Sequence, residues 1–157
     1  MTALAAAAST KPAFNKVLFD ELTHIKGSLY DLFHKALSGA SVEGELASYI
    51  ERIYALDAES GKLKITLYTQ ALLYSMHLSY WSHVKSLITH ELSSNVTQGN
   101  LIAILWKAGF EGEFETCMLL LKNHRERMRH RDGRFVFLAK KSLFDKMDYF
   151  SPCQETD

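Results

Sequence analysis

Apolar residues recur at spacings of three and four along most of this chain, the pattern of a helix with one buried face. Proline, which interrupts helices, occurs only at Pro12 and Pro152. The longest apolar stripe predicts a first helix over residues 13–37. Its members are Phe14, Leu18, Leu22, Ile25, Leu29, Leu32 and Ala36. The pattern therefore predicts an all-α protein.

The same periodicity predicts further helices after the first. Their expected ranges are residues 44–58, 66–78, 80–92, 95–109, 111–131 and 135–150. The join near residue 79 is either a tight turn or only a kink. We expect a single helical bundle of six to seven helices over residues 13–150, with a flexible tail at 1–12 and a second tail at 151–157.

Some helix ends carry recognisable signals. Asn95 stands three residues before Gln98, the spacing of a capping box, and is expected to cap the fifth helix. The sequon Asn95-Val-Thr97 is accordingly interpreted as a helix cap rather than a glycosylation site. Gly109 is expected to close that helix. The sixth predicted helix has glutamates at its start and arginines at its end, which suits the helix dipole.

The composition is that of an ordinary globular domain. The chain has 157 residues, of which 47% are hydrophobic and 23% are charged, with 18 basic and 18 acidic side chains. This balance gives no overall attraction for polyanions, so a nucleic-acid role needs local clustering of charge. We interpret Cys117 as a buried, reduced core thiol. No secretory signal or membrane span is expected, and the predicted location is cytoplasmic or nuclear.

A search for catalytic or metal-binding patterns gives little. Glu21 and His24 match the Glu-x-x-His motif of di-iron helical bundles, but such a site needs a second copy of the motif on another helix. The nearest analogue, Asp31 and His34, lies on the same helix. His24 and His34 are expected to be solvated. His83 and His90 share a helix face without a third ligand at metal-binding spacing. We expect no enzyme activity, no metal and no cofactor.

The largest local charge lies between His124 and Arg134, where five arginines in eleven residues face two acids, for a net charge of +3. The arginines are Arg125, Arg127, Arg129, Arg131 and Arg134. The segment is interpreted first as a solvated helix end, then as a contact for an acidic protein partner, and third as an RNA contact. Trp81 and Trp106 stand inside apolar stripes and are predicted to be core aromatics.

One stretch has a distinctive order of features. It consists of Tyr49-Ile-Glu-Arg-Ile-Tyr-Ala-Leu56, Gly61-Lys-Leu-Lys-Ile65, the positions Leu72, Leu73, Leu78, Trp81 and Leu92, and residues 101–107. This hydrophobic pattern resembles the helical bundle shared by the steroid receptor RNA activator protein and the C-terminal region of the outer scaffold subunit of COPII vesicle coats. The proline that often follows the Gly-Lys-Leu turn is Thr66 here.

That resemblance implies a non-enzymatic module that binds protein partners, in vesicle-coat assembly or in nuclear regulatory complexes, and it carries over no catalytic residue. We therefore expect an adaptor or assembly module. RNA binding through the five arginines is the first alternative, and a helical enzyme with a site hidden in the bundle is the second. Self-association through the stripe of the first helix is a further hypothesis, although burial of that stripe in the chain's own core is favoured.

Overall fold

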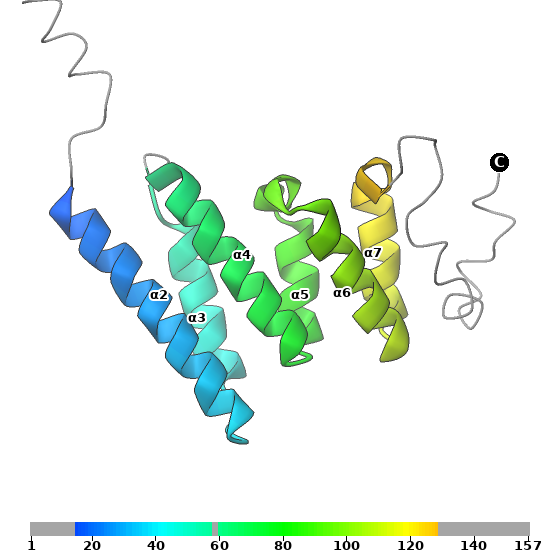
Figure 1. The fold of residues 1–157 in the computed structure, drawn as a ribbon, viewed down its shortest axis with the longest axis horizontal. Helices are drawn as coiled ribbons and strands as arrows, with labels where there is room; N and C mark the ends of the chain where they lie inside the picture. The colour runs from blue at the N-terminus through cyan, green and yellow to red at the C-terminus, as the bar shows by residue number, and fades with distance from the viewer. Residues whose placement is uncertain (1–14, 58–59, 129–157) are drawn as a thin grey trace, which may run out of the picture. The chain divides into compact units, whose positions relative to one another are not determined.

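The computed structural model describes residues 15–57 and 60–128. Within these ranges the chain forms α-helices and short 3-10 helices and no strand, which confirms the all-α prediction (Figure 1). The elements are α2 (Lys16–Leu37), α3 (Glu43–Tyr54), α4 (Gly61–His77), α5 (Trp81–Thr89), η2 (Glu91–Asn95), α6 (Gln98–Phe110), α7 (Phe114–His124) and η3 (Glu126–Met128). The predicted tails and the predicted helix at 135–150 lie outside the described residues.

The chain divides into two compact units, and the division falls inside α4, between Ala71 and Leu72. In the first unit α2 packs against α3. In the second unit α7 packs against both α5 and α6, and η2 packs against α5. The expectation of a single domain over residues 13–150 stays a prediction.

The core of the first unit is built from the predicted stripe of α2. Ile25 and Leu29 are fully buried, and they lie among other buried apolar side chains of both helices. These are Leu22 and Leu32 of α2 and Leu46, Ile50 and Ile53 of α3. The stripe therefore serves the chain's own core, and these side chains of α2 are not exposed to a second copy.

The core of the second unit includes Cys117. Its thiol is fully buried, and its Sγ lies 3.7 Å from the backbone oxygen of Leu105. Burial raises the pKa of Cys117 to about 12, and the nearby Glu113 carboxylate acts in the same direction. The thiol is therefore protonated at neutral pH, which confirms its interpretation as a core residue.

Several predicted helix boundaries are wrong. The helix α3 ends at Tyr54 rather than at residue 58, and α4 begins at Gly61 rather than at residue 66. The helix α5 ends at Thr89 because the Nδ1 atom of His90 accepts a hydrogen bond from the Leu92 amide at 3.1 Å, which opens the 3-10 helix η2. The helix α7 extends only from Phe114 to His124.

The predicted cap of the fifth helix is also wrong. Asn95 belongs to η2, where its side chain donates to the backbone oxygen of Leu92 at 3.2 Å. The cap of α6 is Thr97, whose hydroxyl accepts from the Asn100 amide. Gly109 lies inside the last turn of α6, and it is Gly112, with a φ of 77°, that takes the left-handed conformation after the helix.

Three cationic side chains close the ends of preceding helices. The last carbonyls of a helix have no partner within the helix and need donors from elsewhere. Lys64 of α4 donates to carbonyls at and just after the end of α3, Lys107 of α6 donates to carbonyls at the end of α4, and Arg127 of η3 donates to carbonyls around the end of η2. The acceptors are Tyr54 (3.0 Å) and Leu56 (2.8 Å) for Lys64, Met76 (2.8 Å) and His77 (2.9 Å) for Lys107, and Ser93 (3.0 Å) and Val96 for Arg127.

Glu111 joins the turn before α5 to the end of α6. Its carboxylate accepts from the Trp81 indole at 2.9 Å and from the Ser79 hydroxyl at 3.1 Å, and it pairs with Lys107 at 3.6 Å. Ser79 has a φ of 60°, an unfavourable backbone conformation for a residue other than glycine. The carboxylate thus holds a strained turn beside the second unit's core.

Opposing effects set the pKa of Glu111. Burial acts to raise it, but the hydrogen bonds from Trp81 and Ser79 and the charge of Lys107 together lower it. A carboxyl group with a lowered pKa stabilises the folded state at neutral pH. That stabilisation is lost as the pH falls below the unfolded value of about 4.3 and through the folded value.

We expect Glu111→Ala to lower the free energy of unfolding by about 1–2 kcal/mol, because the buried indole N–H of Trp81 loses its acceptor. Glu111→Gln, which keeps an amide oxygen, is expected to lose less. Urea denaturation at neutral pH measures both. Glu115, whose side chain is 72% exposed in its pair with Lys85, is the control, and an equal loss in Glu115→Ala would contradict this role for Glu111.

Candidate interaction surface

The structure describes only the first part of the basic segment. Arg125 follows the last residue of α7 as its cap, and Arg127 lies in η3. Arg129, Arg131 and Arg134 lie outside the described residues. Over residues 125–128 the chain therefore does not continue the predicted helix, because α7 ends at His124 and a 3-10 helix follows.

Arg127 is not a free surface cation. Its guanidinium donates to the Ser93 and Val96 backbone oxygens, and its own backbone oxygen accepts from the Gln98 side chain at 2.8 Å. Through these hydrogen bonds Arg127 connects η3 with η2 and α6. Its guanidinium donors are thus used by backbone oxygens at the end of η2, and its assignment as a partner or RNA contact stays a prediction.

His124 is buried next to Arg127. Its Nε2 atom lies 3.3 Å from the Ile88 backbone oxygen, and its Nδ1 atom lies 3.5 Å from Nη1 of Arg127. Burial lowers the pKa of His124, the Arg127 charge lowers it further, and the hydrogen bond to Ile88 partly offsets both. A neutral ring that donates from Nε2 and accepts at Nδ1 fits both neighbours.

The two tryptophans differ in burial. Trp81 is 7% exposed and belongs to the core of the second unit. Trp106 is half-buried, with its Nε1 atom inside the protein. The prediction of a core aromatic is confirmed for Trp81, whereas Trp106 is only partly buried.

The histidines of α2 lie on its surface. His24 and His34 are exposed, as predicted; the His24 ring lies 6.3 Å from the Tyr49 ring, over which Arg52 is placed at 5.2 Å. Among the residues that the structure describes, no group of three or more histidine, cysteine or acidic side chains is placed to hold a metal ion. No helix in those same ranges is long and apolar enough to cross a membrane.

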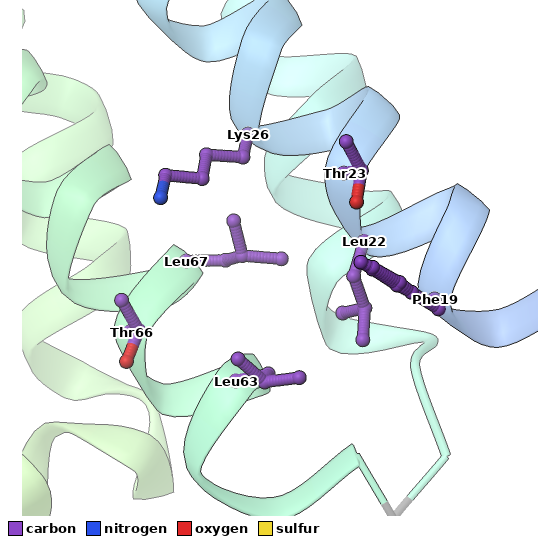
Figure 2. Close-up of a pocket in the computed structure, with 7 residues that line it drawn as sticks. All are labelled: Phe19, Leu22, Thr23, Lys26, Leu63, Thr66 and Leu67. Carbon is purple, nitrogen blue, oxygen red and sulfur yellow. The ribbon is translucent and has the colours of Figure 1, made fainter. Parts of the chain in front are cut away.

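The first unit contains an open pocket between α2 and α4, with a volume of about 230 Å³ (Figure 2). Leu22 and Leu67 are buried, whereas Phe19 and Leu63 remain 44% and 56% exposed. The full lining is Phe19, Leu22, Thr23 and Lys26 of α2 and Leu63, Thr66 and Leu67 of α4. An apolar surface of this kind, left in contact with water, is typical of a binding site.

Figure 2 shows how the side chains around this pocket are arranged. Phe19 lies at one side of it, and the ammonium group of Lys26 and the hydroxyl of Thr66 lie on the side away from Phe19. The lining is thus apolar with a single cation. The sequence pattern predicts Leu22 as part of the core stripe but gives no signal for Phe19 and Leu63, because Phe19 lies beside the stripe and Leu63 lies in the predicted turn.

Comparison of the chain with protein-family models, with curated proteins and with solved structures gives no match. The resemblance to the bundle of the steroid receptor RNA activator protein and the COPII scaffold subunit stays a prediction.

We expect Arg127→Ala to lower the free energy of unfolding by about 1–3 kcal/mol, because two backbone oxygens at the end of η2 lose charged donors. Arg127→Lys, with a single ammonium group, is expected to recover only part of this loss. Chemical denaturation measures the change. Lys122→Ala, at an exposed position of α7, is the control and should stay within about 0.5 kcal/mol of the parent; a comparable loss there would refute the structural role of Arg127.

A second prediction concerns the loss of stability at acidic pH that His124 causes. The lowered pKa of His124 means that the unfolded chain binds a proton at this site more readily than the folded one. Stability due to His124 is therefore full above the unfolded pKa of about 6.5 and is lost as the pH falls through the folded value. Denaturation midpoints at pH of about 7 and about 5 should differ less in His124→Gln than in the parent. An unchanged pH dependence in His124→Gln would contradict the prediction.

Proposed function

We propose that this chain is a non-enzymatic adaptor or assembly module that binds a protein partner through the pocket between α2 and α4. The observation that carries the proposal is the pair Phe19 and Leu63, large apolar side chains that remain about half exposed at the rim of an apolar pocket. Each such side chain, when covered, contributes roughly 25 cal/mol for every Å² of apolar surface removed from water.

The pocket is favoured over other exposed apolar positions because its exposed side chains converge. Val17 of α2 and Phe110 of α6 are more exposed, at 79% and 75%, but neither lines the pocket. Isolated apolar side chains on a surface are common in monomeric proteins. Convergence around a cavity is what distinguishes a candidate binding site from this background.

The non-enzymatic part of the proposal is supported by the chemistry of the buried titratable groups. Burial raises the pKa values of Cys117 and Tyr68, so both are protonated at neutral pH and neither is activated as a nucleophile. His124 is engaged by a backbone oxygen and by Arg127. The resemblance noted above also implies an interaction module rather than a catalyst. Vesicle-coat assembly and nuclear regulatory complexes are the settings that it suggests.

The alternative function is RNA binding through the basic segment. The segment carries Arg125, Arg127, Arg129, Arg131 and Arg134. Because Arg127 also donates to backbone oxygens within the second unit, the test changes the other four, Arg125, Arg129, Arg131 and Arg134. RNA affinity that falls with salt, and whose salt dependence is reduced in the variant with these four arginines changed to glutamine, would support it. We expect no such binding at physiological salt.

The proposal is tested by capture of partners from native lysate with the full chain, Leu63→Glu and Val17→Glu. We expect specific partners to be lost in Leu63→Glu, because a carboxylate at the rim must be desolvated when the pocket is covered. Val17→Glu changes an exposed residue of α2 outside the pocket and should retain them.

Circular dichroism should show both variants as folded as the parent. Partners retained equally by all three proteins would place binding elsewhere, and capture of RNA in preference to protein would favour the alternative.

A further inference from the structure

The pocket is lined by one face of each of two helices. On α2 the lining positions are 19, 22, 23 and 26, and on α4 they are 63, 66 and 67, both sets at helical spacing. The backbone groups in these helices are engaged in helical hydrogen bonds, so the walls offer no strand edge to an extended peptide. A trough between two helices instead fits the side chains of a third helix laid along it.

The volume of the pocket limits what can fill it. At about 230 Å³ it is smaller than the roughly 300–1,000 Å³ of pockets that hold whole cofactors or drug-sized ligands. A cavity of about 150 Å³ holds one benzene molecule. The pocket therefore accommodates one aromatic or two aliphatic side chains, which is the size of an anchor on a larger partner.

The lining of the pocket carries one charged side chain, which is a cation. Lys26 is the charged residue of its lining, and Lys62 stands one helical turn before Thr66 on the same face of α4. Within residues 15–57 and 60–128 neither lysine makes an ion pair or a side-chain hydrogen bond. The acids of this part of α2 are already paired, Asp20 with Lys16 at 3.1 Å and Glu21 with Arg52 at 3.6 Å.

We propose that the pocket binds an amphipathic helix of a partner protein, which inserts one or two large apolar side chains between Phe19 and Leu63 and pairs a carboxylate with Lys26. The inference rests on the proposed function and adds the chemistry of the partner. The apolar anchors supply most of the affinity, because they are removed from water. The carboxylate sets the orientation and the specificity, because a partner helix with a cation at that position is repelled by Lys26.

The probe is a displayed library of helical peptides, about 20 residues long so that they are helical in isolation, with one face randomised. The full chain is the target, and peptides that also bind Leu63→Glu are discarded. We expect the remaining peptides to carry large apolar residues at spacings of three, four and seven with an acidic residue about one turn away. Lys26→Glu should weaken their binding about tenfold.

Charge reversal supplies the matched test. A selected peptide whose acidic residue is changed to lysine should bind the parent protein weakly. The same changed peptide should bind Lys26→Glu with about the affinity that the original peptide has for the parent. Lys122→Glu, which reverses an exposed cation of α7, should leave all affinities unchanged. Peptides that need Leu63 but show no acidic preference and no response to Lys26→Glu would overturn the inference while leaving the proposed function intact. The absence of any Leu63-dependent peptide would count against both.

Other occupants of the pocket give different outcomes. A dimer of the full chain that becomes a monomer in Leu63→Glu, measured by sedimentation, would assign the pocket to a second copy. A rise in peptide affinity of tenfold or more in Leu4→Glu would assign it to the chain's own N-terminal segment. Either result would overturn the inference.

Discussion

The need of helix ends for hydrogen-bond donors is the constraint on which the described structure depends. The fold brings carbonyls at and just after the end of a helix beside elements that follow later in the chain: α4 beside the end of α3, α6 beside the end of α4, and η3 beside the end of η2. Lys64, Lys107 and Arg127 each come from a following element and each donate to two such carbonyls. A fully buried carbonyl without a donor costs about 1–3 kcal/mol. The contacts here are part-buried, and the one to the His77 oxygen is exposed, so that figure is an upper bound for each side chain.

This constraint also determines which charges remain available for binding. Arg127 donates to backbone oxygens at the end of η2, and Lys107 is shared between the end of α4 and Glu111. Lys26 and Lys62, by contrast, have no such partner in the ranges that the structure describes. Lys26 lines the apolar pocket of the first unit, and this combination of a cation and apolar surface underlies the proposed recognition of an acidic amphipathic helix.

The sequence predicts the helices well and the site poorly, for one physical reason. Periodicity is a local property, so the stripe through Ile25 and Leu29 correctly predicts a buried face. Helix ends and charge partners depend on residues about 30 positions away, as in the contact from Arg127 to Val96. The local charge of the basic segment therefore indicates a solvent-exposed surface, whereas in the structure Arg127 donates to backbone oxygens of the second unit. The sequence does not indicate the pocket, because its pattern predicts Leu63 in a turn. In the structure α4 begins at Gly61, which places Leu63 on a helix and in the lining of the pocket.

Hydrogen exchange measured at individual amides tests the capping role most directly. Lys64→Met and Lys107→Met keep the length of the side chain but remove its donors, whereas Lys62→Met changes an exposed lysine of the same helix as Lys64. If the cations hold the helix ends, exchange should accelerate about tenfold or more at the last turn of α3 in Lys64→Met and at the last turn of α4 in Lys107→Met, and should not change in Lys62→Met. Equal exchange at these turns in all three variants and the parent would contradict the role assigned to these cations.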